Sequence, residues 1–168
     1  MQSETTTRVS VATCLWFDDQ AEQAAEFYTS LIPGSRIHNR MCDAAQAPPL
    51  LVEFTLGGSP YQALNGGPHF VHSEAASISV LTSSQEETDR LWAALTADGG
   101  SESQCGWLKD RFGVSWQIVP RRFIELQGSD DKAAVQRARQ AMFSMRKLDL
   151  ATLEAAFYGA APAEGEDA

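Results

Sequence analysis

The sequence contains the stretch GSPYQAL at residues 58–64 and, at an offset of 55 residues, the related stretch GVSWQIV at residues 113–119. In both stretches an aromatic residue precedes a glutamine, which is Gln62 in the first and Gln117 in the second. Neighbouring side chains of a strand point to opposite faces of a sheet. We therefore expect each aromatic ring to pack under a helix and each glutamine to face the other way, as equivalent strands of a repeated module.

A strand and a helix precede the first of these stretches. Residues 9–17 are rich in β-branched and aromatic side chains, which is typical of a strand. Apolar residues at three- and four-residue steps then predict a helix that ends at about Leu31, with Asp18 or Asp19 as its N-cap. Three short strands complete this first module, and the stretch that contains Gln62 is the last of them.

The same order of elements returns in the second half of the chain. A strand over residues 76–81 leads to a helix that ends at about Ala97, and Ser83 or Ser84 is the expected N-cap. A further strand is predicted near residues 103–109, before the second repeated stretch. The repeat therefore covers most of the chain.

We predict an α+β fold in which two βαβββ modules form a curled, mixed half-barrel sheet with the helices outside. Helical periodicity after the second module predicts a helical C-terminal extension. The predicted segments are a first module over residues 9–66, a second module over 76–120, C-terminal helices over 121–159 and a disordered tail over 160–168.

Composition narrows the function classes. The chain has 168 residues, of which 43% are hydrophobic and 21% charged, as in an ordinary globular domain. The net charge of −9 argues against binding to nucleic acid. No apolar run approaches the ~20 residues that span a membrane. The N-terminus lacks the pattern of a secretion signal, and three cysteines at no metal-like spacing indicate reduced thiols. We therefore expect a cytoplasmic protein that binds no membrane.

Four segments, in the right order, resemble one branch of the vicinal oxygen chelate superfamily, which includes glyoxalase I, bleomycin-resistance proteins and extradiol dioxygenases. The branch is usually labelled 3-demethylubiquinone-9 3-methyltransferase, or PhnB-like. The matching segments are residues 15–28, 54–68, 105–120 and 141–150. The resemblance implies the paired-module fold described above.

The resemblance also implies where a metal would bind. Metal-using members of the superfamily take His, Glu or Gln ligands from the first and last strand of each module, and these positions are Thr13, Gln62, Ser77 and Gln117 here. An offset of 64 residues between the first strands pairs Thr13 with Ser77. Amides and hydroxyls are poor ligands for Zn, Ni or Fe, which prefer imidazole, thiolate or carboxylate. We predict no metal cofactor, and the alternative is a weakly bound divalent metal.

The same four positions are predicted to line the binding site. We expect Gln62 and Gln117 to project into one shared pocket, with Thr13 and Ser77 beside them, because a buried amide needs a hydrogen-bonding partner. Such a pocket is suited to a neutral or weakly polar organic molecule.

Trp107 and Lys109 are further candidates for lining the cleft, because they share strand parity. The Trp107 ring could stack on a planar ligand and Lys109 could meet an anionic group; the alternatives are core packing and solvation. Cys105 shares this parity and is an idle thiol unless a base lies nearby. Glu53 lies in the middle of a predicted strand and faces either the cleft or solvent.

Three function classes remain. The first is a homodimeric small-molecule-binding protein, in the manner of bleomycin-resistance proteins. The second is a metal-dependent lyase, isomerase or dioxygenase, as the superfamily implies. The third is a methyltransferase, as the label of the branch states, and no glycine-rich loop that could bind S-adenosylmethionine follows a strand in the sequence. Ligand chemistry favours the first class, and open sheet edges favour a homodimer.

Overall fold

The structure is a computed structural model that describes residues 9–42 and 48–159. The chain divides into two compact units, Met1–Val71 and His72–Ala168. The predicted tail over residues 160–168 lies outside the described residues. No helix in the described part of the chain is long and apolar enough to cross a membrane.

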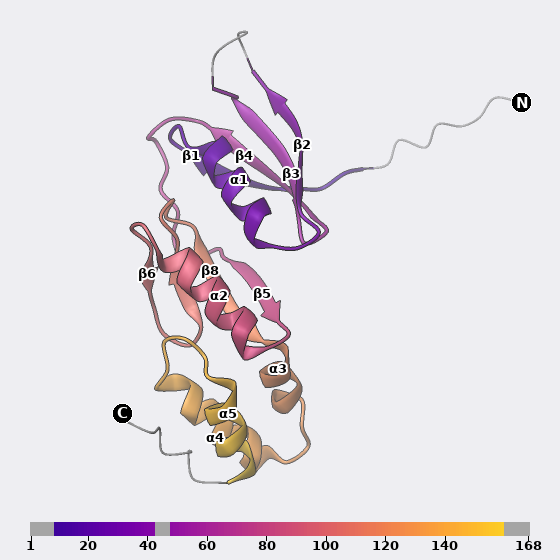
Figure 1. The fold of residues 1–168 in the computed structure, drawn as a ribbon, viewed down its shortest axis with the longest axis vertical. Coiled ribbons are helices and arrows are strands. Elements are labelled where there is room, and N and C mark those ends of the chain that lie inside the picture. The colour runs from indigo at the N-terminus through magenta and orange to yellow at the C-terminus, as the bar shows by residue number, and fades with distance from the viewer. Residues whose placement is uncertain (1–8, 43–47, 160–168) are drawn as a thin grey trace, which may run out of the picture. The chain divides into compact units, whose positions relative to one another are not determined.

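The first unit is a four-stranded mixed sheet with one helix against it (Figure 1). The strand order is β1-β4-β3-β2, in which β1 and β4 are parallel and the other pairs antiparallel. The helix buries Ala24 and Tyr28 completely, which is the apolar stripe that the sequence predicts. The elements are β1 (Thr13–Phe17), α1 (Ala21–Leu31), β2 (Arg36–Met41), β3 (Leu51–Leu56) and β4 (Ser59–Asn65).

The start of α1 is not capped as predicted. Neither Asp18 nor Asp19 is the N-cap: that position is Gln20, whose side chain makes no capping hydrogen bond. Instead Asn65, at the end of β4, accepts a hydrogen bond from the backbone N–H of Ala21 at 2.8 Å. The parallel pairing of β1 with β4 brings the end of β4 to the helix start, so a residue distant in sequence supplies the cap.

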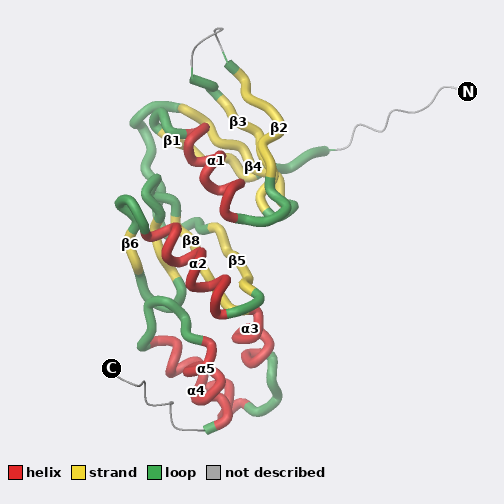
Figure 2. Tube along the Cα trace, in the orientation of Figure 1, coloured by secondary structure: helices red, strands yellow, loops and turns green. Residues whose placement is uncertain are grey.

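The second unit repeats this plan and adds three helices (Figure 2). Its sheet order is β5-β8-β7-β6, again with a parallel first pair. Ser84 caps α2 as predicted, accepting a hydrogen bond from the N–H of Glu87 at 3.2 Å. The elements are β5 (Ile78–Thr82), α2 (Gln85–Thr96), β6 (Ser101–Glu102), β7 (Trp107–Lys109), β8 (Ser115–Pro120), α3 (Arg121–Gln127), α4 (Lys132–Phe143) and α5 (Leu150–Tyr158).

The repeat predicted from the sequence is confirmed. β4 and β8 occupy equivalent positions, since each pairs in parallel with the first strand of its unit and antiparallel with the third. The α+β class, the two βαβββ modules and the C-terminal helices are therefore correct. The exact division of the chain into segments stays a prediction.

The single strand predicted near residues 103–109 is wrong. The chain turns at Cys105 and Gly106, which both have positive φ, 59° and 83°. The turn separates the short β6 from β7, so Cys105 is not a strand residue. A side chain at Gly106 would lie 2.9 Å from the carbonyl oxygen of Ile118, which explains the glycine there.

The C-terminal helices have a small core of their own and bind to this turn. Phe123, Leu153 and Phe157 belong to the core, with Leu148 fully buried among them. The N–H groups of Cys105 and Gly106 donate to the carbonyl oxygens of Met145 and Arg146, at 2.8 and 2.7 Å. The segment between α4 and α5 therefore braces the β6–β7 turn.

Candidate functional site

Strand pairing decides which predicted site residues share a face. In the first unit Gln62 pairs with Cys14 of β1 and with Glu53 of β3, so these three side chains lie on one face. Thr13 pairs with Tyr61 and lies on the opposite face, with the buried Leu15 and Phe17. The expectation that Thr13 lies beside Gln62 therefore fails.

In the second unit the predicted pair does come together. Gln117 pairs with Ser79 of β5 and with Trp107 of β7. Its side-chain amide donates to the hydroxyl of Ser77, which precedes β5, at 2.8 Å. Gln62 and Gln117 lie in different units, and their meeting in one pocket stays a prediction.

The error at Thr13 has a simple cause. The helices of the two units align at an offset of 64 residues, since Ala21 corresponds to Gln85. The first strands align at 65, because three residues join β1 to α1 and only two join β5 to α2. A one-residue shift moves a side chain to the other face of a sheet. Ala12 rather than Thr13 therefore corresponds to Ser77.

A small pocket of about 270 Å³ lies on the open face of the first unit. Glu53 is central to it: one carboxylate oxygen accepts from the Gln62 amide at 3.3 Å and the other from the Asn39 amide at 3.2 Å. His38 and Thr55, also in the pocket, are hydrogen-bonded to each other. Of the two alternatives for Glu53, the structure places it in a pocket.

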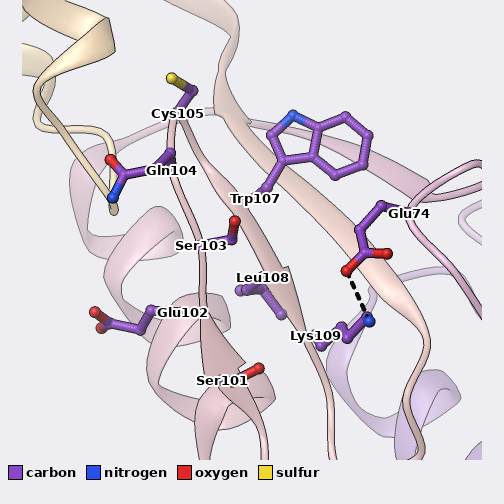
Figure 3. A pocket seen from close by; sticks show the side chains of 9 residues that line it. All are labelled: Glu74, Ser101, Glu102, Ser103, Gln104, Cys105, Trp107, Leu108 and Lys109. Atoms are coloured by element: carbon purple, nitrogen blue, oxygen red, sulfur yellow. Dashed lines mark ion pairs between the residues drawn. The ribbon is translucent and has the colours of Figure 1, made fainter.

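A larger pocket, of about 550 Å³, lies wholly within the second unit. Trp107 and Lys109 both line it, while Leu108 between them is 1% exposed. In Figure 3 the Trp107 ring and the Lys109 ammonium lie toward the same side of β7. The lining residues are Glu74, Ser101, Glu102, Ser103, Gln104, Cys105, Trp107, Leu108 and Lys109.

Charges within this pocket are paired. The Lys109 ammonium lies 2.7 Å from a carboxylate oxygen of Glu74, and its hydrogen bond lowers the pKa of that carboxyl. Glu102 accepts a hydrogen bond from the Trp92 ring at 2.7 Å and lies 3.6 Å from Arg146. The pocket thus combines an aromatic ring and a cation with hydroxyl and amide groups, which suits a planar ligand with a polar or anionic substituent.

Two important residues near this site were not predicted from the sequence. Glu74 sits outside any predicted element, and only the fold brings it to Lys109. Asp110 is 3% exposed and binds the turn after β7, and its spacing of three residues from Gly113 is the one local signal for this role.

The positions implied for a metal do not provide suitable donors. Gln117 and Ser77 are neutral and hydrogen-bonded to each other, and Thr13 lies on the opposite face from Gln62. Among residues 9–42 and 48–159 no group of three or more His, Cys, Asp or Glu side chains could hold a metal ion. A divalent metal at the family positions does not fit this donor set.

Comparisons with known proteins support the paired-module fold. A family model described as 3-demethylubiquinone-9 3-methyltransferase matches residues 9–119. A PhnB protein from Bacillus cereus, named for the same methyltransferase, is 28% identical, with 67% of this chain and 99% of that chain covered and a TM-score of 0.61.

Two more distant structures share the fold. A protein from Pseudomonas aeruginosa is 21% identical over 67% of this chain and 98% of that one, with a TM-score of 0.55. The fosfomycin resistance protein FosX from Listeria monocytogenes is 14% identical over 71% and 96%, with a TM-score of 0.52. No curated protein matches the chain significantly.

Proposed function

Because the chain belongs to the family described as 3-demethylubiquinone-9 3-methyltransferase, the PhnB-like branch of the vicinal oxygen chelate superfamily, we propose that it is a small-molecule-binding protein whose ligand lies against Trp107. The observation that carries this proposal is the 550 Å³ pocket in which Trp107 and Lys109 lie together. Its volume is within the range of about 300–1,000 Å³ typical of ligand sites.

The chemistry of the pocket supports a planar organic ligand. Trp107 is half-buried, so one part of its ring is held by the protein and the rest is open to a ligand. Gln117 pairs with Trp107 across β7 and β8, and its side chain is hydrogen-bonded to Ser77. Gln117 and Ser77 are therefore candidates for further polar contacts with the ligand. Assembly as a homodimer and a cytoplasmic location stay predictions.

Replacing Trp107 with alanine is expected to weaken binding of a planar probe, naphthalene carboxamide, about tenfold. An aromatic pair contributes about 0.5–1.5 kcal/mol beyond its buried area, and 1.4 kcal/mol corresponds to a factor of ten in Kd. The measurement is a calorimetric titration of the wild type and W107A. Phe143→Ala is the control, since this exposed ring on α4 does not line the pocket. If the wild type and W107A bound the probe with equal affinity, the proposal that the ligand lies against Trp107 would be wrong.

We expect no tight binding of S-adenosylmethionine, despite the methyltransferase in the family's description. Such cofactors bind a glycine-rich turn between a parallel strand and its helix. The parallel strands β1 and β5 are followed by Asp18, Asp19 and Gln20 and by Ser83 and Ser84, with no glycine in either turn. A calorimetric titration that gave micromolar or tighter affinity would refute this expectation and favour methyl transfer.

A further inference from the structure

Glu74 and Lys109 both line the pocket and form an ion pair with each other (Figure 3). Among the nine described residues that line the pocket, Lys109 alone is cationic. Its ammonium is therefore the group in this lining that can recognise an anion, and in the free protein a carboxylate oxygen of Glu74 lies 2.7 Å from it.

The two members of the pair are held very differently. Lys109 belongs to β7 and is paired on both sides, with Ser101 of β6 and Ser115 of β8. Glu74 lies outside the strands, in a turn whose hydrogen bonds from Ala75 and Ala76 to Ser73 are both 3.4 Å long, beyond the usual range. The side chain of Glu74 is 67% exposed against 35% for Lys109. The sheet thus holds the backbone of the cation on both sides, whereas its carboxylate partner extends from an exposed turn.

The pocket's other carboxylate does not compete for this position. Glu102 accepts a hydrogen bond from the Trp92 ring at 2.7 Å and lies 3.6 Å from a guanidinium nitrogen of Arg146. These two partners hold Glu102 on the β6 side of the pocket. Glu74 is therefore the carboxylate that a ligand anion would replace.

The neighbour of Lys109 on the same face indicates the rest of the ligand. Trp107 is two residues away along β7, a distance of about 6.6 Å along an extended strand. A flat ring lying on the indole would direct a carboxylate attached to it toward the Lys109 ammonium. An exposed ion pair contributes little to stability, so exchanging Glu74 for a ligand carboxylate carries a small cost.

We propose that Glu74 is an internal stand-in for the ligand's anionic group, and that the ligand is a planar aromatic carboxylate which displaces Glu74 from Lys109. This inference rests on the proposed function and adds to it the ligand class and a built-in competitor. In the free protein Glu74 lowers affinity for anions and excludes those too weak to displace it. The exchange replaces one ion pair of Lys109 with another, and no covalent bond is formed or broken.

The test compares naphthalene carboxylate with naphthalene carboxamide, its neutral counterpart, by calorimetry at fixed salt. Glu74→Gln removes the competing charge and keeps the length of the side chain. We expect E74Q to bind the carboxylate about fivefold more tightly, near the upper limit for an exposed ion pair, and the carboxamide with less than a twofold change. Lys109→Met is expected to abolish the preference for the carboxylate.

Glu102→Gln is the matched control, because it removes the same charge from the same pocket and can still accept the hydrogen bond from Trp92. If the competing charge acts through Lys109, the affinity for naphthalene carboxylate should rise much less in E102Q than in E74Q. Equal gains in both variants, or no gain in E74Q, would overturn the role of Glu74.

The two proposals fail in different ways. If both probes bind in a Trp107-dependent manner and E74Q has no effect, the displaced-carboxylate inference falls and the binding function stands. If neither probe binds the wild type or E74Q, both fall. Thermal unfolding followed by circular dichroism is expected to give the same midpoint for E74Q and wild type, since the pair is exposed.

Discussion

Replacing Asp110 with alanine is expected to lower the free energy of unfolding of the second unit by about 3 kcal/mol or more. The Asp110 carboxylate is buried, and it accepts hydrogen bonds from the N–H groups of Phe112 and Val114 at 2.9 and 3.0 Å and from the Trp116 ring at 2.8 Å. Alanine removes the acceptor that these three donors share, and the loss of a buried hydrogen-bonding partner costs about 1–3 kcal/mol. Denaturant unfolding followed by near-UV circular dichroism measures the change, because Trp116 is fully buried.

Asp110→Asn separates hydrogen bonding from burial. Asparagine keeps one oxygen for the two backbone donors and turns an amide N–H toward the Trp116 ring N–H. Its loss of stability is expected to be smaller than that of the alanine variant. Glu125→Ala, which removes an exposed carboxylate paired with Arg122 on helix α3, is the control and is expected to cost less than about 1 kcal/mol. A loss below that value in D110A would contradict the role assigned to the carboxylate.

The contacts of Asp110 are an example of what the sequence does not predict, in contrast to the two modules. The modules were predictable because strand alternation and helix periodicity are local patterns, and because Gln62 and Gln117 recur at a fixed offset. The contacts of Asp110 with backbone N–H groups depend on a turn of positive φ at Gly113, which a strand pattern does not reveal. The fold was therefore more accessible to prediction than the polar contacts that hold it.

Other features of the site and fold were missed or misplaced because they depend on how the strands pair. Asn65 caps α1 from 44 residues away, a contact that only the pairing of β1 with β4 creates. Thr13 was placed on the wrong face because one extra residue in a turn changed the offset of the repeat. Glu74 meets Lys109 from a turn that carries no pattern of its own. Each case requires the register of the sheet, which composition and periodicity leave open.

Replacing Leu148 with alanine is expected to cost about 2–5 kcal/mol of unfolding free energy, the usual range for a fully buried leucine. Leu148 is 0% exposed within the core of the C-terminal helices. The backbone around it is fixed: Gln85, at the start of α2, donates to the Leu148 carbonyl at 3.1 Å and accepts from the Leu150 N–H at 2.8 Å. A cavity bounded in this way cannot collapse easily, so the loss is expected toward the upper end of the range.

The same substitution tests whether the C-terminal helices support the pocket, since they lie beyond the residues that the family model matches. Leu148 packs against Gly106, where an added Cβ would lie 3.2 Å from its side chain. Loss of this contact is expected to speed hydrogen exchange at the N–H groups of Cys105 and Gly106, which bind the segment before Leu148. Ile124→Ala on α3, where the side chain is 48% exposed, is the control and is expected to leave both amides protected. Equal exchange rates at these two amides in L148A and the wild type would mean that the turn holds its shape without the C-terminal helices.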